Sequence, residues 1–354
     1  MPVIDADTHL DESEATWAAL EGTPYAKYIP ATVTIAPNEA ERMGLNLVNT
    51  RRWLVEGKLQ SRAIRDEINH PPRVRRELLD VPGRLAHMDE LGVDVQVVFP
   101  TFFIRYDPEN PEAEWALTTT YNRWLAGKCA ETNGRLRWAA VLPLLSPDKA
   151  AEELRWAKAH GAVGIYKRGF DQERPASDRQ FFPVYEEASA LDVPICIHTG
   201  HPGRDPGGDR GVPIIGAFGD LLDGRIPEKF PKLRFGFIEA GASWIPYALA
   251  QRGAQKRQAM RGQNSRLPTI FEIEPDLFKK NRFFVTVDAI DDVQYILKYG
   301  TEDSLMVGTD YSHTDISANL SALDEVRGWA EQGLISQAAA KKILETNPRA
   351  FYGL

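Results

Sequence analysis

Acidic and histidine side chains lie at the end of the first apolar segment of the chain. Asp5, Asp7 and His9 alternate there with Ile4 and Ala6. Residues two apart on a β-strand share a face, so the three polar groups are predicted to point the same way. Burying two carboxylates and an imidazole together is costly unless a counter-charge is present, and a divalent cation supplies one. The alternative is a strand end whose acidic groups are solvated.

The same residue types recur after three later apolar segments. They are His198 and His201 in Ile-His-Thr-Gly-His, Glu239 in Phe-Ile-Glu-Ala-Gly, and Asp310 and His313 in Gly-Thr-Asp-Tyr-Ser-His. A lone histidine in such a place is usually structural, but structural polar residues have no reason to gather on one rim of a fold. Several nitrogen and oxygen ligands with an open position are typical of catalytic zinc, manganese or iron. We therefore predict a divalent metal site, with zinc favoured.

The candidate ligands outnumber the positions that a single ion offers. Asp7, Glu239 or Asp310 could bridge two ions. Alternatively, some of the carboxylates orient the imidazoles that bind one ion. One ion is the favoured prediction, and two ions are the alternative.

These residues need a fold that brings the ends of distant segments together. Short apolar segments alternate with helical periodicity, as in βα units around a parallel sheet. No glycine fingerprint follows the first strand, so a closed (β/α)8 barrel is favoured over an open doubly wound sheet. Helices are predicted at 147–160 and 182–191. Strands are predicted at residues 3–9, 94–100, 137–142, 162–168, 193–198, 233–239, 283–288 and 304–310.

The whole chain of 354 residues is predicted to form one barrel domain, because barrels with insertions routinely reach this length. Residues 10–92 are predicted to be an insertion between the first two strands, helical in part. Residues 200–231 are rich in glycine and proline and are predicted to form a lid or specificity loop. Residues 253–280 are polar with little periodicity; we expect a solvated connection, with oligomer contacts as the alternative.

Amino-acid composition and charge limit which classes of molecule the protein is expected to bind. Hydrophobic residues make up 43% and charged residues 26%, and the net charge of −8 comes from interspersed acids and bases. Nucleic acid is therefore not an expected partner, whereas a small molecule is. The sequence shows neither a signal-peptide pattern nor an apolar stretch of about 18 residues. With only two cysteines, Cys129 and Cys196, a cytoplasmic protein outside the membrane is predicted.

Several of these motifs together resemble a known family. Asp-Thr-His at residues 7–9, His198, and Asp310 in Gly-Thr-Asp-Tyr-Ser-His resemble the amidohydrolase superfamily. They are most similar to its amidohydrolase-2 branch, which includes aminocarboxymuconate-semialdehyde decarboxylase and the resorcylate-type decarboxylases. The segment 237–246 is a further local match. The resemblance covers nearly the whole chain and implies that Asp7, His9 and His198 are metal ligands and that Asp310 binds or approaches the metal.

The resemblance also implies a substrate and an assembly. It implies a small carboxylated metabolite and a homodimer or higher oligomer, with a hetero-oligomer containing a paralogue as the alternative. Lys167 and Arg168, at the end of the fourth strand, could neutralise a substrate carboxylate. The alternative for this pair is a charged strand end that points to solvent. Trp244, within the local match, is a third predicted substrate-binding residue.

The implied chemistry is decarboxylation or hydrolysis, with Asp310, Glu239 or His201 as acid or base. Decarboxylases of this branch have a histidine near the end of the sixth strand, where this chain has Glu239. An acid there could be a metal ligand or a general base instead. Two alternatives remain: a dinuclear non-haem iron or manganese oxygenase that hydroxylates its substrate, and a metal-stabilised, non-catalytic partner subunit.

Overall fold

One eight-stranded parallel sheet forms the centre of the molecule. The structure, a computed structural model, describes residues 2–43, 51–61, 71–200, 211–261, 276–314 and 317–354. Each strand of this sheet coincides with a predicted strand, so the predicted barrel is confirmed. In order around the sheet the strands are β1 (Ile4–His9), β5 (Val95–Phe99), β6 (Leu136–Val141), β7 (Ala162–Arg168), β10 (Ile195–His198), β11 (Phe235–Ile238), β12 (Phe283–Val287) and β13 (Leu305–Val307).

The barrel is nearly closed by contacts between β1 and the segment that follows β13. Thr8 and Tyr311 form a parallel bridge. The His9 amide donates to the Tyr311 carbonyl at 2.8 Å, and the Asp310 amide donates to the Asp7 carbonyl at 3.0 Å. The first and last strands therefore meet at the residues that the sequence singles out.

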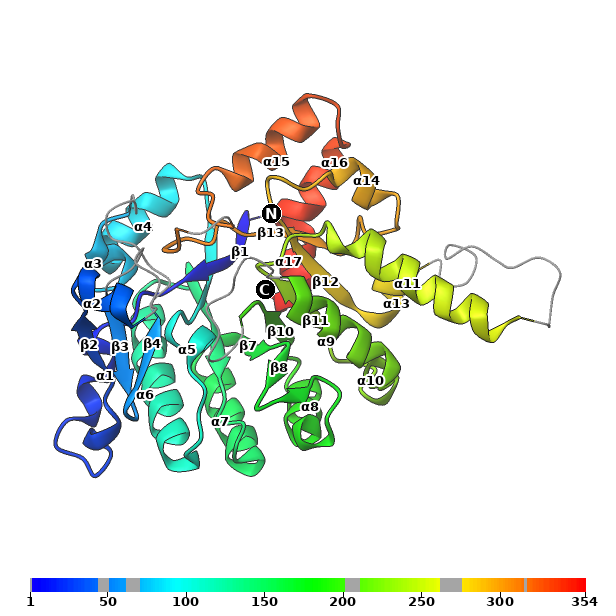
Figure 1. Ribbon diagram of the computed structural model, residues 1–354. Coiled ribbons are helices and arrows are strands. Elements are labelled where there is room, and N and C mark those ends of the chain that lie inside the picture. The colour runs from blue at the N-terminus through cyan, green and yellow to red at the C-terminus, as the bar shows by residue number, and fades with distance from the viewer. Residues whose placement is uncertain (1, 44–50, 62–70, 201–210, 262–275, 315–316) are drawn as a thin grey trace.

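Helices surround this barrel (Figure 1). Two of them, α7 (Pro147–Ala159) and α8 (Phe182–Ala190), closely match the helices predicted at 147–160 and 182–191. Each ends shortly before a residue with positive φ, Gly161 at +93° and Asp192 at +54°. Among the described residues, none of the helices is both long enough and apolar enough to cross a membrane. The main helices are α4 (Val81–Glu90), α6 (Pro111–Ala130), α7 (Pro147–Ala159), α8 (Phe182–Ala190), α9 (Gly211–Asp223), α11 (Trp244–Ala259), α13 (Leu277–Asn281), α14 (Val293–Leu297), α15 (Ala322–Glu331), α16 (Gln337–Lys341) and α17 (Asn347–Tyr352).

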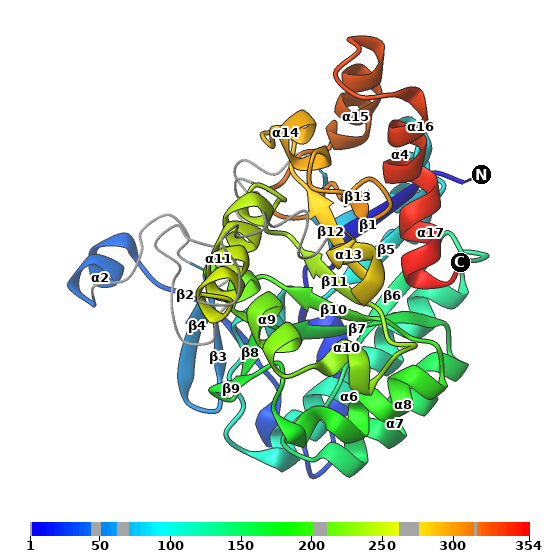
Figure 2. The same ribbon diagram turned by 90° about the vertical axis from the view of Figure 1, so that its right-hand side faces the viewer.

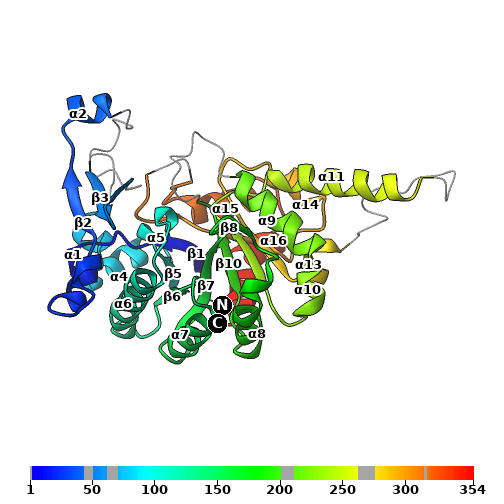
Figure 3. The same cartoon turned by 60° about the horizontal axis from the view of Figure 1, so that its bottom comes forward.

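The insertion after β1 contains a small antiparallel sheet that the sequence did not predict. Its strands are β2 (Ala31–Thr34), β3 (Arg51–Val55) and β4 (Lys58–Ser61), and the short helices α1 (Glu14–Trp17), α2 (Pro37–Arg42) and α3 (Arg73–Arg76) complete the insertion. Trp53 and Val55 are buried while Leu54 is exposed, which is the alternation of a half-buried strand. This sheet and α11 lie on opposite sides of the barrel (Figures 1 and 3).

Two predicted connections contain helices. Residues 211–223 form α9 instead of a lid loop, because Ile214, Ala217, Phe218 and Leu221 are buried at helical spacing. Residues 253–259 belong to α11, a helix that the sequence did not predict, and most of them are exposed, as expected of a solvated segment. The rest of the predicted lid, 201–210, and residues 262–275 lie outside the described residues.

The last turn of α17 closes the amino-terminal end of the barrel (Figure 2). Tyr352 donates its hydroxyl to the Ala6 carbonyl at 2.6 Å, and its ring approaches Gly164 on β7. Phe351 packs against Gly236 on β11. Small residues on these strands leave the space that the two rings fill.

Replacing Gly236 by alanine is expected to destabilise the fold by about 1–3 kcal/mol. A β-carbon at this position would lie 2.4 Å from Cζ of Phe351, and a buried ring has little room to move. Urea unfolding measures the change. The matched control is Gly127→Ala in α6, where a β-carbon meets nothing within 4 Å. That control is expected to be neutral or to gain up to about 1 kcal/mol; equal stability of the two variants would contradict the prediction.

Candidate metal centre

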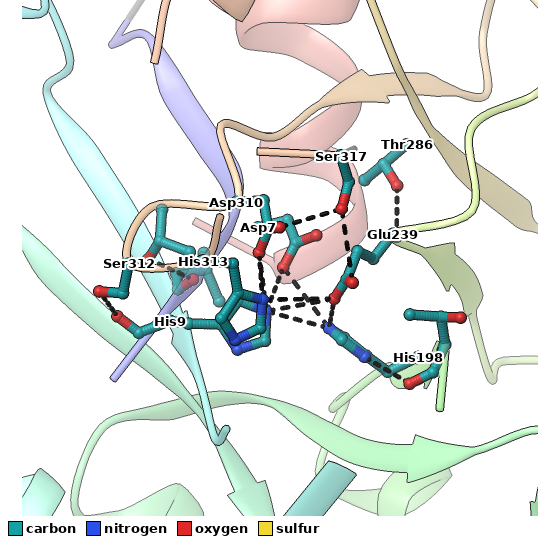
Figure 4. A network of polar contacts seen from close by, with 12 residues as sticks. Asp7, His9, His198, Glu239, Thr286, Asp310, Ser312, His313 and Ser317 are labelled. Carbon is teal, nitrogen blue, oxygen red and sulfur yellow. Dashed lines mark hydrogen bonds and ion pairs between the residues drawn. The ribbon is translucent and has the colours of Figure 1, made fainter. Parts of the chain in front are cut away.

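Six of the predicted residues converge at the carboxyl ends of the strands (Figure 4). All six are at most 6% exposed. They form two overlapping groups, in each of which the potential ligand atoms lie within 4.8 Å of one another. One group is Asp7, His9, His198 and Glu239, and the other is His9, Glu239, Asp310 and His313. We call these six residues the metal cluster.

His9 lies at the centre of the metal cluster. Its Nε2 atom is 3.4 Å from Asp7 Oδ1, 3.5 Å from Glu239 Oε2 and 3.4 Å from Asp310 Oδ1. His198 Nε2 is 3.0 Å from Glu239 Oε2. His313 Nδ1 is 2.7 Å from Asp310 Oδ1. Three carboxylates and three imidazoles therefore meet in a volume that excludes most solvent.

Backbone carbonyls determine the tautomers of two of the histidines. His9 Nδ1 is 2.9 Å from the Pro100 carbonyl, and His198 Nδ1 is 2.8 Å from the Thr199 carbonyl. A carbonyl only accepts, so both Nδ1 atoms carry the hydrogen and both Nε2 atoms present a lone pair. These two Nε2 atoms are 3.2 Å apart. Two lone pairs at this distance repel each other unless a cation or a proton lies between them.

A hydroxyl determines the tautomer of His313 in the same way. Thr101 donates its hydroxyl to the Leu10 carbonyl at 2.6 Å, which uses its one proton. The Thr101 oxygen, 3.0 Å from His313 Nε2, must therefore accept from that nitrogen. His313 Nδ1 then presents its lone pair to Asp310. The sequence did not point to Thr101, because a threonine in a loop carries no signal of this role.

The protonation states suit a bound metal ion. Burial, together with the nearby His313, lowers the pKa of His9 to about 4, so its imidazole is neutral at pH 7. Burial alone would raise the pKa of Asp7, but the contacts with His198 and His9 hold it below its usual range. Asp7 Oδ1 is buried and has no hydrogen-bond partner among the described residues. Neutral imidazoles and ionised carboxylates are the forms that bind divalent metals, so these residues fit one.

The carboxylates are held in place by unusual backbone conformations and by two hydroxyls. Glu239 and Asp310 have φ values of +61° and +51°, in the left-handed region that side chains rarely adopt. The Glu239 amide donates to Thr286 Oγ at 2.9 Å. Ser317 donates to Asp310 Oδ2 at 3.0 Å and lies 3.5 Å from Glu239 Oε1. Ser317 lies in a loop well beyond the strand end, so the sequence did not identify it.

Asp5 lies outside the metal cluster, and the predicted shared face with Asp7 and His9 is wrong. The pairing of β1 with β5 shifts register between Asp5 and Thr8, which breaks the two-residue alternation. Asp5 accepts hydrogen bonds from the Thr309 amide at 2.9 Å and hydroxyl at 2.6 Å, and from Gln96 at 3.2 Å. Burial raises the pKa of Asp5 to about 7, although these bonds from Thr309 oppose the shift.

Lys167 and Arg168 do not point to solvent, because both side chains are buried. Lys167 Nζ lies 2.7 Å from Asp171 Oδ2, and Arg168 Nε lies 2.8 Å from Asp171 Oδ1. Arg168 also donates to the Tyr106 carbonyl at 2.7 Å. The two charges are thus held in a buried ion-pair network at the end of β7.

Trp244, predicted to bind substrate, lies apart from the metal cluster. Trp244 begins α11, and its ring packs edge-on against Phe218 and Phe237. Its indole NH donates to the Gly241 carbonyl at 2.9 Å, so Trp244 belongs to the aromatic core. His201 lies outside the described residues.

Comparison with known proteins finds relatives that match nearly the whole chain. Residues 4–354 match the model of a family described as amidohydrolase. A gamma-resorcylate decarboxylase from Polaromonas sp. strain JS666 is 27% identical over 297 residues, which cover 77% of this chain and 87% of the relative.

Solved structures show the same fold. An amidohydrolase from Mycobacterium avium subsp. paratuberculosis K-10 superposes with a TM-score of 0.74 at 17% identity, over 100% of this chain and 98% of that one. The 2,6-dihydroxybenzoate decarboxylase from Rhizobium has a TM-score of 0.59 at 23% identity, over 76% and 87% of the two chains. At these identities, the structural likeness concerns the fold.

Proposed function

The chain belongs to the amidohydrolase family that it matches over residues 4–354, and from this premise we propose that it is a metal-dependent carboxy-lyase acting on a small aromatic carboxylate. The observation that carries the proposal is the convergence of three imidazole lone pairs with three carboxylates inside a buried cluster. The names of two similar proteins, a gamma-resorcylate decarboxylase and a 2,6-dihydroxybenzoate decarboxylase, support the substrate class.

The proposed ligands are Asp7, His9 and His198, with Glu239, Asp310 and His313 completing the donor set. When bound, the ion would hold substrate oxygens and stabilise the negative charge that develops as carbon dioxide leaves. Zinc is the favoured ion, and manganese and iron suit the same nitrogen and oxygen donors.

The chain's own residues would supply the proton. When the bond to the carboxyl group breaks, its electron pair stays on the ring carbon, which must then take a proton. Asp310 is the proposed donor, because Ser317 fixes its Oδ2 atom and His313 lies beside its Oδ1 atom. Glu239, fixed through its amide and adjacent to His198, is the proposed second acid–base group.

The first test combines elemental analysis of the purified protein with an assay of carbon dioxide released from 2,6-dihydroxybenzoate. We expect about one ion per chain and release of carbon dioxide that a chelator stops. Cleavage of amides or lactones without carbon dioxide release would instead identify a hydrolase. If the metal-loaded protein showed neither carbon dioxide release nor hydrolysis, the proposal would be contradicted.

A dinuclear oxygenase is the second candidate, and one observation favours it. The two ligand groups share only His9 and Glu239, so each could hold a separate ion. This candidate predicts about two iron or manganese ions per chain and consumption of oxygen in the presence of substrate. A stoichiometry near one ion, with no oxygen uptake, would exclude it.

A further inference from the structure

A small hollow of about 30 Å³ lies at the carboxyl ends of β6 and β7. Its lining includes Glu114, Tyr166, Arg168 and Asp171. The pairing of β7 with β10 places Arg168 opposite His198, and paired residues of parallel strands share a face. The ring centroids of Tyr166 and His198 are 5.5 Å apart. The hollow and the metal cluster therefore share one wall.

The lining of this hollow carries an excess of buried positive charge. Lys167 and Arg168 are 3% and 4% exposed, and both pair with the same carboxylate, that of Asp171, which is 4% exposed. Burial raises the pKa of Glu114 to about 8, although the backbone amides of Leu144 and Leu145 oppose the shift. Glu114 is therefore mostly uncharged at pH 7. A bound anion would offset the remaining positive charge.

Tyr166 also lines the hollow. Tyr166 is 5% exposed, and its hydroxyl is buried without a hydrogen-bond partner among the described residues. Leaving such a buried donor unsatisfied is unfavourable. A ligand oxygen in the hollow would accept from it. Arg168 and Tyr166, two residues apart on one strand, would then contact the same group.

We propose that the hollow binds a second anionic group of the substrate, so that the substrate carries two acidic groups on one small framework. One group would lie at the metal cluster, and the other between Arg168 and Tyr166. The placement of the first group rests on the proposed function. Lys167 is a less suitable contact, because its ammonium lies 4.1 Å from the Phe181 ring centroid and is held by Asp171. The shared wall limits the separation of the two groups to roughly the size of one aromatic ring.

The test measures binding of isophthalate, which has two carboxylates, and benzoate, which has one, to zinc-loaded protein by calorimetry. We expect isophthalate to bind at least about tenfold more tightly. Arg168→Gln should remove this preference and Arg168→Lys should keep part of it. Tyr166→Phe should weaken isophthalate about fivefold, with little change for benzoate. The matched control is Tyr121→Phe, which removes another buried, unpartnered hydroxyl outside the hollow and should change neither affinity.

Several results would overturn this inference. They are equal affinities in the wild-type protein, no binding of either probe, or a preference that survives Arg168→Gln. Thermal unfolding of each variant separates these results from misfolding, and Arg168→Lys retains the charge if the glutamine variant is unstable. Because the measurement needs no turnover, a preserved preference without carbon dioxide release would count against the proposed reaction alone.

Discussion

Replacing Asp310 by asparagine is expected to slow turnover about 10²- to 10⁴-fold, the usual contribution of a positioned acid or base. Asparagine keeps the size of the side chain and can still accept from Ser317, which donates to Oδ2 at 3.0 Å. It cannot carry the transferable proton. The rate of carbon dioxide release from 2,6-dihydroxybenzoate measures the effect.

The metal content of the variant distinguishes the two roles proposed for Asp310, proton transfer and metal binding. If the ion is retained while the rate falls, Asp310 acts mainly in proton transfer; if the ion is lost in parallel, it acts mainly as a ligand. The matched control is Asp324→Asn on α15, whose side chain is 74% exposed and pairs with Arg327. This control should keep full activity. Wild-type activity in Asp310→Asn would contradict both roles.

The barrel was predictable because its strands are short, apolar and separated by helical periodicity. The rim residues were predictable for a related reason: parallel strands place their carboxyl ends together, so His198, Glu239 and Asp310 had to be neighbours. The local sequence around each of them shows only that a polar residue follows an apolar segment. Their convergence is a property of the topology, and the sequence pattern predicts the topology.

The sequence predictions that failed did so for physical reasons that a short sequence pattern does not contain. A one-residue register shift in β1 turns Asp5 away from Asp7, although strict alternation would place them together. Thr101 and Ser317 orient His313 and Asp310 from loops, where distances depend on the whole chain. Lys167 and Arg168 are buried because Asp171, on the next short strand β8 (Phe170–Asp171), neutralises part of their charge.

Replacing Gly308 by alanine is expected to weaken metal binding about 10- to 100-fold, the range typical of lost support around a ligand. A β-carbon at Gly308 would lie 2.4 Å from Cβ of Asp7 and 3.1 Å from its Cα. Because the contact is with backbone and Cβ atoms, Asp7 cannot avoid it by a change of rotamer. Asp7 and Asp310 are also linked by a backbone hydrogen bond of 3.0 Å, so the displacement would change the spacing of both carboxylates.

Competition with a chelator measures the metal affinity, and urea unfolding of the chelated protein measures the stability. Gly308→Ala should lose about 1–3 kcal/mol of stability as well as metal affinity. Gly236→Ala has a similar overlap at the opposite end of the barrel, with Phe351, and should lose stability alone. Gly127→Ala should lose neither. If Gly236→Ala and Gly308→Ala weakened metal binding equally, the effect would reflect general instability; if Gly308→Ala bound metal normally, the position of Asp7 would not determine the affinity.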